Sequence, residues 1–437
     1  MSLSLSLYQS SRKAQSRQKT CSLTGGGELK VIQIPRRFVE EEWGGTETAI
    51  LQTSRVLNAR GNDSVIHTTT ALCDRKHEIF SGVAVRRHNY LYPFWGLTSQ
   101  DRHDMDRKGG NLMSFSMLWS LLRTKRPDIL HAHTGKRLGG IVRTVARLRG
   151  LPYVISLHGG VVDVPGDEMQ KMLAPLRGKF EWGRILGALL GARRVLDDAS
   201  AIICVGRNEQ EAVSARYPGK RIEWIPNGVD SKRFATGNGQ AFREKYQIPQ
   251  TSKLVVCVGR IDYQKNQLSL LPVLSQLAGQ HKGVHLALIG PVTVESYREQ
   301  LIKAVCRAGL DDRVTLIPGI PGSSPELVDA YHAADIFCLP SRHEPFGIVI
   351  LEAWAAGLPV VASAVGGIPT FTRDGVDIIH ADPEEPQSFS DAIDSLLLDP
   401  DLARRIAENG RLKAQRDYDW SQVTKRLEAL YLDLVED

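Results

Sequence analysis

The sequence lacks any apolar run long enough to cross a lipid bilayer. Its longest candidates, such as Ile185–Leu190 and Phe346–Leu351, are far shorter than the roughly 20 apolar residues that a membrane helix needs. The polar, Ser-rich residues 1–27 also lack the apolar centre of a secretory signal. We therefore expect these residues to form a disordered arm, and we expect the protein to be cytoplasmic.

Cysteine is scarce as well. The six cysteines are scattered along the chain without the spacing of a metal site. Three of them, Cys204, Cys257 and Cys338, lie within apolar, strand-like runs. We expect these three to be small buried hydrophobic residues in a reducing compartment.

No nucleic-acid motif accompanies the positive charge of the chain. The net charge of +6 hides a division, because residues 1–220 hold 33 Lys and Arg against 20 Asp and Glu (+13), and residues 221–437 hold 22 against 29 (−7). A basic half suits an anionic ligand, an anionic membrane surface or nucleic acid, and the alternative is an ordinary solvated surface. Without a motif we expect no nucleic-acid partner.

Residues 163–198 alternate cations with apolar residues. Such a basic amphipathic segment can lie on an anionic membrane, which would make the protein peripheral at that surface. The alternative, which we favour, is one or two helices that pack on the domain core.

The chain is too long for one ordinary core, so we expect two domains. Strand-like runs alternate with helical runs, which predicts parallel, doubly wound sheets. Residues 90–106 show no clear period, and we expect a loop there. The fold class is therefore α/β, with two Rossmann-like domains that face a central cleft, the default place for a site. The expected strands are 29–35, 64–69, 83–87, 128–133, 152–157, 201–205, 221–225, 253–258, 285–289, 314–317, 336–340 and 360–362.

Dense turn chemistry at Ile225–Asp230 indicates the linker between the domains. We expect an N-terminal domain over residues 28–225, a C-terminal domain over residues 226–415, and a last segment, 416–437, that returns to the first domain. The expected helices of this tail are 386–398, 402–415 and 420–434.

Gly44 and Gly45 form a turn between the first strand and a helix expected over residues 46–59. Glycines allow close backbone approach, and a helix N-terminus offers unpaired N–H groups to an anion. The dinucleotide-binding fingerprint requires a third spaced glycine, which is absent here. The alternative is an ordinary tight turn.

His158 follows the last apolar residue of a strand and precedes two glycines. Ligands bind at this carboxyl end of the strands in open α/β sheets, so His158 is a candidate site residue, and a structural hydrogen bond is the alternative. His131 and His133 end another strand. We expect no metal at these histidines, because no acidic or Cys residue has a matching spacing.

Arg260 and Lys265 flank a turn between a strand and a helix. Two cations with a helix N-terminus behind them suit a diphosphate group. The alternative is a chance pairing on the surface.

Glu352 lies eight positions after Glu344, inside an apolar helix expected over residues 347–356. A carboxylate is costly to bury there unless it is paired or hydrogen-bonded. Eight helical residues rise roughly 12 Å, which argues against an acid–base dyad. Two separated carboxylates are better suited to accept hydrogen bonds from hydroxyl groups a nucleotide's length apart.

Taken together, these motifs resemble family 4 of the retaining glycosyltransferases, which have the GT-B fold. The resemblance covers about residues 29–434, and one departure is Asn266, where the family often has glycine. The motifs are the E-x7-E pair Glu344 and Glu352, the Gly-Gly-Thr-Glu loop, Leu157-His158-Gly159, the Ile-Pro-Asn-Gly-Val-Asp segment, and Gly259-Arg260 with Lys265.

The resemblance implies a role for each matched residue. Arg260 and Lys265 would neutralise the leaving diphosphate, Glu344 would hold hydroxyls of the donor sugar, and His158 would lie beside its far hydroxyl. These four are the implied catalytic residues. The implied donor-binding residues are Glu352 at the ribose, Gly44 and Gly45 in a mobile loop, and Phe346, Gly347 and Ile348 through their backbone.

The implied activity is the retaining transfer of a sugar from a nucleotide diphosphate sugar, which is a co-substrate, with no bound cofactor or metal. The acceptor is not identified by the sequence, and the basic half suggests an anionic or lipid-linked molecule. One alternative is another GT-B enzyme, such as a nucleotide-sugar epimerase or a disaccharide phosphorylase. Another is a non-catalytic nucleotide-sugar-binding protein.

Overall fold

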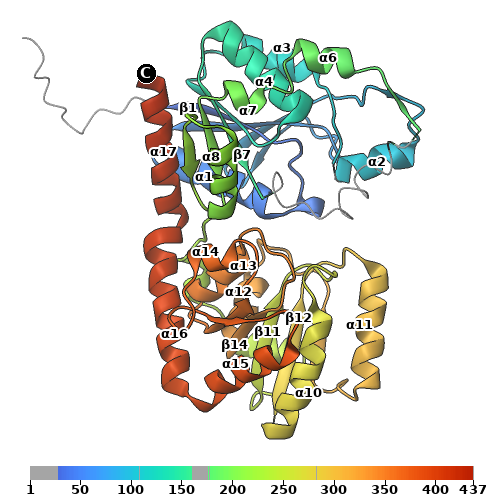
Figure 1. Ribbon diagram of the computed structural model, residues 1–437, viewed down its shortest axis with the longest axis vertical. Coiled ribbons are helices and arrows are strands. Elements are labelled where there is room, and N and C mark those ends of the chain that lie inside the picture. The colour runs from blue at the N-terminus through green and yellow to red at the C-terminus, as the bar shows by residue number, and fades with distance from the viewer. Residues whose placement is uncertain (1–27, 108, 160–175, 177, 282, 437) are drawn as a thin grey trace, which may run out of the picture.

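Two α/β domains stand one above the other in the computed structural model (Figure 1). The structure describes residues 28–107, 109–159, 176, 178–281 and 283–436. The expected arm and most of the first half of the amphipathic segment 163–198 lie outside these residues.

The upper domain is built on an eight-stranded sheet in the order β10-β9-β7-β6-β1-β2-β4-β3. All neighbouring strands are parallel except β3 and β4, which form an antiparallel pair at one edge. The central strands β6, β7 and β9 are buried along their whole length, as expected where helices cover both faces of a parallel sheet. The strands are β1 (Lys30–Ile34), β2 (Asp63–Thr69), β3 (His77–Phe80), β4 (Val83–His88), β6 (Ile129–Ala132), β7 (Tyr153–Leu157), β9 (Ala201–Cys204) and β10 (Ile222–Trp224).

The lower domain has a six-stranded, fully parallel sheet in the order β13-β12-β11-β14-β15-β16. The two sheets confirm the expectation of two doubly wound, Rossmann-like domains. The short edge strand β16 was not expected from the sequence. The strands are β11 (Lys253–Val258), β12 (Val284–Ile289), β13 (Val314–Ile317), β14 (Ile336–Leu339), β15 (Val360–Ser363) and β16 (Ile379–Ala381).

Helices cover both faces of the upper sheet. Buried residues of α3 and α4 form one core with the sheet, and those of α1 form another with its opposite face. The helices of this domain are α1 (Gly45–Ala59), α2 (Ser99–Arg107), α3 (Phe115–Arg123), α4 (Lys136–Arg149), α6 (Arg184–Leu189), α7 (Val195–Asp198) and α8 (Arg207–Arg216).

The expectation of a loop over residues 90–106 was wrong. This segment contains β5 (Phe94–Trp95), which pairs with β8 (Phe180–Glu181), and the helix α2. Only Met105 and Asp106 of α2 are buried, so the helix carries almost no apolar period. Two tyrosines hold its end instead, since the hydroxyls of Tyr90 and Tyr92 donate hydrogen bonds to Asp106 at 2.5 and 2.8 Å.

The short helices α9 and α14 of the lower domain were not expected from the sequence. The other helices begin and end close to the expected residues, except the one after Lys265. The helix after Lys265 does not follow the turn directly, because a 3-10 turn, η4 (Gln267–Ser269), intervenes. The helices are α9 (Gly239–Lys245), α10 (Leu270–Gln280), α11 (Glu295–Arg307), α12 (Pro325–Ala333), α13 (Ile348–Ala355), α14 (Ile368–Phe371), α15 (Pro386–Leu398) and α16 (Pro400–Lys413).

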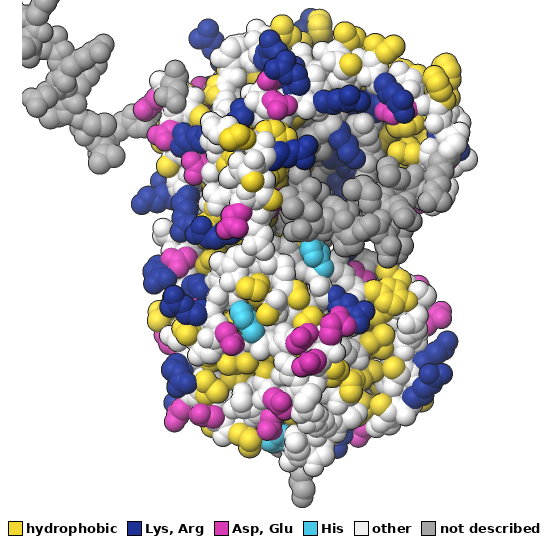
Figure 2. All heavy atoms as spheres, in the orientation of Figure 1, with side chains coloured by type: hydrophobic (Ala, Val, Ile, Leu, Met, Phe, Trp, Pro, Cys, Tyr) yellow, Lys and Arg dark blue, Asp and Glu magenta, His cyan; other side chains and the backbone are white. Residues whose placement is uncertain are grey.

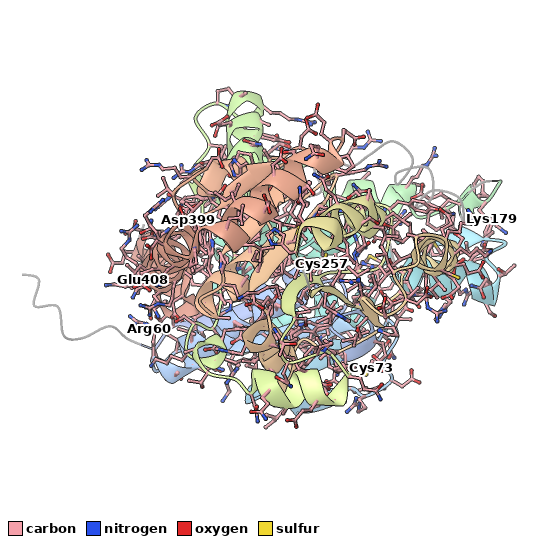
Figure 3. The ribbon with its side chains drawn as sticks, turned by 90° about the horizontal axis from the view of Figure 1, so that it is seen from below. Arg60, Cys73, Lys179, Cys257, Asp399 and Glu408 are labelled. Atoms are coloured by element: carbon pink, nitrogen blue, oxygen red, sulfur yellow. The ribbon has the colours of Figure 1, made fainter. Side chains whose placement is uncertain are left out.

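A long helical segment runs along one side of both domains (Figure 1). It consists of α16, a π-helical turn (Ala414–Tyr418) and α17 (Trp420–Glu436). Apolar residues of α17 share a core with β1, β6, β7 and β9 of the upper sheet. Glu428 of α17 accepts hydrogen bonds from Arg60, labelled in Figure 3, and from Asn62, at 2.8 and 2.7 Å. The last helix therefore packs on the upper domain.

The chain crosses between the domains twice, and the two crossings touch. The Val229 N–H donates to the Tyr418 carbonyl at 2.8 Å, and the Trp420 N–H donates to the Val229 carbonyl at 3.0 Å. A Cβ on Gly228 would lie 2.8 Å from the Trp420 ring, so only glycine fits between the crossings. We call this pair of crossings the neck.

Cys204, Cys257 and Cys338 are buried and carry free thiols, as expected, and Cys257 is labelled in the interior in Figure 3. Within the described part of the chain, no helix combines the length and the apolar composition that a membrane span requires.

Candidate active site

The facing edges of the two domains meet at glycines. A Cβ on Gly45 would lie 3.1 Å from Cδ1 of Ile348, and a Cβ on Gly159 would lie 2.5 Å from Cβ of Pro345. The side-chain amide of Asn208 also donates to the Gly366 carbonyl at 3.0 Å across this interface. The turn before α1, the end of β7 and the loop before α13 therefore come together, although they are far apart in the sequence.

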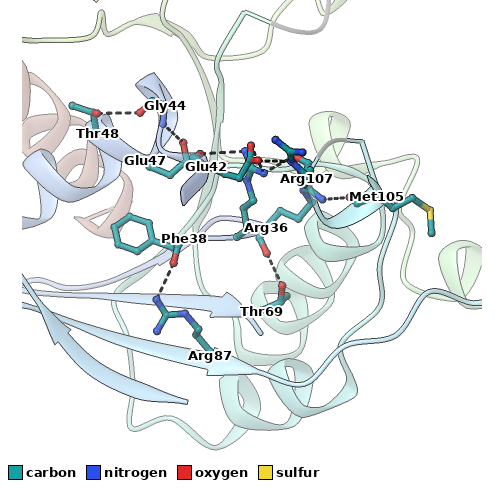
Figure 4. A network of polar contacts seen from close by, with 11 residues as sticks. Arg36, Phe38, Glu42, Gly44, Glu47, Thr48, Thr69, Arg87, Met105 and Arg107 are labelled. Carbon is teal, nitrogen blue, oxygen red and sulfur yellow. Dashed lines mark hydrogen bonds and ion pairs between the residues drawn. The ribbon is translucent and has the colours of Figure 1, made fainter. Parts of the chain in front are cut away.

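The glycine turn before α1 is held by a carboxylate of its own helix. Glu47 accepts a hydrogen bond from the Gly44 N–H at 3.1 Å, and Thr48 donates to the Gly44 carbonyl at 3.0 Å (Figure 4). Burial raises the pKa of Glu47, and Arg37 lies 3.6 Å from its carboxylate. The Gly44 N–H is thus occupied by Glu47 and is not open to an external anion.

Ion pairs connect this turn to α2. Glu42 accepts from Arg107, at the end of α2, at 2.5 Å (Figure 4). It also accepts from Arg37 at 3.4 Å. Arg36 donates to the Met105 carbonyl at 2.7 Å. The residues that follow β1 and the end of α2 therefore form one polar network beside Gly44.

The three histidines considered as a metal triad come together, but only His133 and His158 are hydrogen-bonded to each other. His131 packs against His133 with ring centroids 4.0 Å apart. His133 Nδ1 lies 2.9 Å from His158 Nε2, and His133 Nε2 lies 2.7 Å from Oε1 of Gln33. His131 contacts the Tyr431 hydroxyl at 2.6 Å and the Ser156 hydroxyl at 2.7 Å. All described members except Tyr431 sit at or just beyond the carboxyl ends of β1, β6 and β7, where a ligand is expected.

These histidines are held neutral by their surroundings. Burial lowers the pKa of His158 to about 4 and that of His131 to about 3. The pKa of His133 falls well below its usual value through burial and the neighbouring His131 and His158. In a neutral imidazole ring, one nitrogen donates a hydrogen bond and the other accepts one.

The loop before α13 is shaped by glycines. Gly347 is the N-cap residue of α13 and has a φ of +97°, which a residue with a side chain rarely adopts. The Gly367 N–H donates to the Glu344 carbonyl at 2.8 Å, and a Cβ on Gly366 would lie 2.2 Å from the same oxygen. Phe346 is buried and stacks on Phe371 with ring centroids 4.7 Å apart. The backbone from Glu344 to Gly347 is therefore fixed at the α13 N-terminus.

Lys265 and Glu344 form an ion pair at the mouth of this loop. Their side chains are only 12% and 9% exposed. The structure thus joins two of the expected site residues directly. Charges buried to this degree need such a partner, because each loses much of its hydration.

Arg260 lies on the same turn and is more exposed. Its guanidinium donates to Gln264 at 2.8 Å and lies 3.3 Å from Asp262. Gln264 in turn donates to the His343 carbonyl at 2.9 Å, which connects the turn to the loop before α13. The helix expected behind the two cations begins with the 3-10 turn η4 at Gln267, and its α-helical part, α10, begins at Leu270.

Asn266 occupies the position at which the family often has glycine. It has φ 55° and ψ 33°, in the left-handed region. Asparagine tolerates this conformation better than most residues with a side chain. The turn therefore keeps a shape that glycine would also allow.

Glu352 and Glu344 have different partners. The Tyr331 hydroxyl donates to Glu352 at 2.7 Å. Burial raises the pKa of Glu352 to about 7, although the Tyr331 hydrogen bond and Arg233 lower it. The second carboxylate is thus separate from the Lys265–Glu344 pair, with one described hydrogen-bond partner.

Sequence reasoning missed Gln33, His133 and Tyr331 as partners of site residues. The one local sign of Gln33 was a polar residue inside the apolar run Leu29–Pro35. In the described ranges, no three His, Cys, Asp or Glu side chains form a group that could hold a metal ion.

Comparison with known families matches nearly the whole described chain. The profile of glycosyltransferase family 4 matches residues 43–233, and that of the glycosyl transferases group 1 matches residues 238–413. The two matches divide the chain near the neck.

The D-inositol 3-phosphate glycosyltransferase of Mycolicibacterium smegmatis is 31% identical over 412 residues, covering 90% of this chain and 87% of the relative. The D-inositol 3-phosphate glycosyltransferase 1 of Catenulispora acidiphila is 30% identical over 324 residues, covering 71% and 73%.

Solved structures share the fold. Anabaena Alr3699/HepE in complex with UDP and glucose has a TM-score of 0.68 at 20% identity, covering 92% of this chain and 99% of that chain. The sucrose-phosphate synthase of Thermosynechococcus elongatus has a TM-score of 0.67 at 22% identity, covering 94% and 100%. At such identities the likeness establishes the GT-B fold alone. From the relatives and both profiles together, the chain belongs to family 4 of the glycosyltransferases, the group 1 enzymes with the GT-B fold.

Proposed function

We propose that this glycosyltransferase moves a hexose from a nucleotide diphosphate sugar to a phosphorylated polyol, with retention at the anomeric carbon. The observation that carries the proposal is the meeting of Lys265, Glu344 and the glycine-capped N-terminus of α13. A cation, a carboxylate and free helix N–H groups are the groups that a diphosphate joined to a sugar requires.

The chemistry follows from these groups. The bond between the anomeric carbon and the diphosphate oxygen breaks, and the acceptor oxygen bonds to the same face of that carbon. The acceptor's proton passes to an oxygen of the departing diphosphate. Arg260, Lys265 and the α13 N-terminus would stabilise the charge that develops on the leaving group. Glu344 would orient hydroxyls of the sugar.

Binding of the nucleotide would use the second carboxylate. Glu352 has one described hydrogen-bond partner, Tyr331, so its remaining lone pairs can accept from the ribose hydroxyls. The Anabaena neighbour was solved with UDP, and UDP is therefore the first nucleotide to test on this chain.

The acceptor proposal rests on two cations of the upper domain. Arg36 follows β1 and Lys136 opens α4 just after β6, the neighbouring strand, so both lie at the edge that carries His158. Their side chains donate hydrogen bonds to backbone carbonyls, Arg36 to those of Met105 and Arg107 and Lys136 to that of Gly109. Burial and then Arg36 lower the pKa of Lys136. A phosphate would compensate both charges, and the relatives are named for an inositol phosphate.

A transfer assay tests this proposal. UDP-glucose and other nucleotide sugars are offered with D-inositol 3-phosphate or with unphosphorylated inositol, and products are read by mass spectrometry. We expect a new glycoside with the phosphorylated acceptor only. Arg36→Gln and Lys136→Gln should raise KM for the acceptor at least tenfold and leave KM for the donor unchanged. An epimerised nucleotide sugar without a glycoside, or phosphate-dependent breakdown of a disaccharide, would favour the alternative GT-B enzymes. Binding of UDP-glucose without any turnover would favour a non-catalytic protein.

Peripheral contact with an anionic membrane is a second candidate property, favoured by one surface. The outer sides of α3, α4 and α6 expose large apolar side chains beside cations at the top of Figure 2. Trp119 is 56% and Leu189 77% exposed, and Arg123 lies over the Trp119 ring at 3.9 Å. Sedimentation with vesicles of phosphatidylglycerol against phosphatidylcholine tests it. We expect Leu189→Glu to reduce binding to anionic vesicles, and equal binding to both lipids would exclude the idea.

A further inference from the structure

The hydrogen bonds of Gln33, His133 and His158 have a defined direction. The Gln33 Oε1 atom can only accept, so the Nε2 of His133, 2.7 Å away, must carry the proton. His133 is neutral, and its Nδ1 therefore has a lone pair.

That lone pair sets the state of the next ring. Nδ1 of His133 lies 2.9 Å from Nε2 of His158, so His158 must donate through Nε2. Since His158 is neutral as well, its Nδ1 carries no proton and is a hydrogen-bond acceptor. Among the described residues this Nδ1 is buried and has no partner.

A buried acceptor without a donor costs free energy, which a donor group of a ligand can recover. His158 directly precedes Gly159, which lies against Pro345 of the loop before α13, beside the sugar-orienting Glu344. A hydroxyl of the donor sugar is the group that can supply the missing proton at this place.

We propose that Gln33 and His133 are positioning residues that fix His158 with its proton on Nε2, so that Nδ1 accepts a hydrogen bond from a hydroxyl of the donor sugar. This inference rests on the proposed function. Gln33 acts from β1 and does not touch the substrate. Through His133, Gln33 makes Nδ1 of His158 an acceptor. The site therefore favours a sugar with a hydroxyl at this position over a sugar that lacks it.

The direct test is the protonation state of the rings. The full chain is labelled with ¹⁵N-histidine, and the His133 and His158 resonances are assigned with His133→Asn and His158→Asn variants. Nitrogen chemical shifts and one-bond couplings to hydrogen then report which nitrogen carries the proton. We expect both rings to be neutral with the proton on Nε2. A His158 ring with the proton on Nδ1, or a charged ring, would overturn the inference.

A variant pair extends the test to specificity. Gln33→Met keeps the size of the side chain and removes the acceptor, so the two rings should populate both tautomers. Ser156→Ala is the matched control, because it removes a buried hydrogen bond of His131 and leaves His133 and His158 paired. We expect the control to leave the His158 tautomer unchanged.

The kinetic readout uses monodeoxy analogues of the nucleotide sugar that the transfer assay identifies. For the wild type, one analogue should lose about tenfold in kcat/KM, the worth of one hydrogen bond. Gln33→Met should lose about tenfold with the parent sugar and nothing further with that analogue. Equal tenfold losses with the parent and every analogue would show a merely structural Gln33. Absence of any glycoside from the wild type would overturn the proposed function, whereas the ring states are measured without turnover.

Discussion

Lys265 pairs with Glu344 where the two expected halves of the donor site meet, the diphosphate side and the sugar side. Both side chains are nearly buried, so each charge depends on the other in the free protein. In the proposed mechanism the diphosphate offers Lys265 a second anion, while the sugar hydroxyls offer Glu344 new donors. The pair therefore keeps two site charges compensated before the substrate arrives.

Removing one member of this pair should affect folding as well as activity. Lys265→Met leaves the Glu344 carboxylate buried without its cation, and we expect a loss of about 3 kcal/mol in the free energy of unfolding. The double variant Lys265→Met, Glu344→Gln should recover most of this loss, since no uncompensated charge remains. Urea denaturation of the wild type, Lys265→Met, Glu344→Gln and the double variant measures the coupling. Additive losses would show that the two charges do not depend on each other.

Arg260 offers a cleaner test of the diphosphate site, because its side chain is 41% exposed. Arg260→Ala should lower kcat about 100-fold or more, the usual effect of removing one group that stabilises transition-state charge. Its unfolding free energy should change little. Arg298→Ala is the matched control, since Arg298 is similarly exposed at 37% and pairs with Glu295 on α11. Wild-type turnover by Arg260→Ala would remove this residue from the site.

Glu352 should make stability depend on pH. Its pKa is raised in the folded state to about 7 from an ordinary 4.5, so the protonated form is favoured by folding. This contribution is fully present below pH 4.5 and is lost as the pH rises through 7. We expect Glu352→Gln to gain about 2 kcal/mol relative to the wild type between pH 5 and pH 8. Denaturant unfolding at both values measures it, and a constant difference would contradict the raised pKa.

The same group should couple nucleotide binding to pH. The ionised carboxylate is the better acceptor for ribose hydroxyls, so the affinity for UDP should rise between pH 6 and pH 8. Glu352→Gln should bind more weakly and lack this rise. Isothermal titration calorimetry with UDP distinguishes the two proteins. An unaltered affinity would mean that Glu352 has a structural role with Tyr331.

Gly159 should be required for the approach of the two domains. Gly159→Ala would place its Cβ 2.5 Å from Pro345 and would also strain a φ of +79°. Gly150→Ala isolates the strain, because Gly150 has a φ of +61° and nothing within 4 Å of an added Cβ. We expect both variants to lose about 1 kcal/mol of stability, and only Gly159→Ala to lose at least tenfold in kcat/KM. Equal activities would show that the contact with Pro345 is not needed for turnover.

The alternation of strands and helices could be predicted because buried parallel strands are short apolar runs, such as Val360–Ala362. The α2 segment could not, since hydrogen bonds from Tyr90 and Tyr92 to Asp106 replace the apolar period that indicates a helix. The start of α10 was misplaced for a related reason. The left-handed Asn266 and the 3-10 turn after it leave no clear mark in the sequence.

Motifs predicted which residues belong to the candidate site, but they did not give its pairings. The Lys265–Glu344 ion pair joins positions 79 residues apart, and the Gln33–His133 contact joins positions 100 apart. Such contacts depend on which strands are neighbours in a sheet and on how the domains face each other. Neither is encoded in local spacing.

The neck has a consequence for the order in which the protein becomes complete during synthesis. Residues 230–418, which form the lower domain, begin and end at the neck. The lower domain is therefore inserted between two segments of the chain that pack in the upper domain. One face of β1, β6, β7 and β9 is covered by α17, which is synthesised after the lower domain. The upper domain therefore completes this part of its core only after the lower domain has been synthesised.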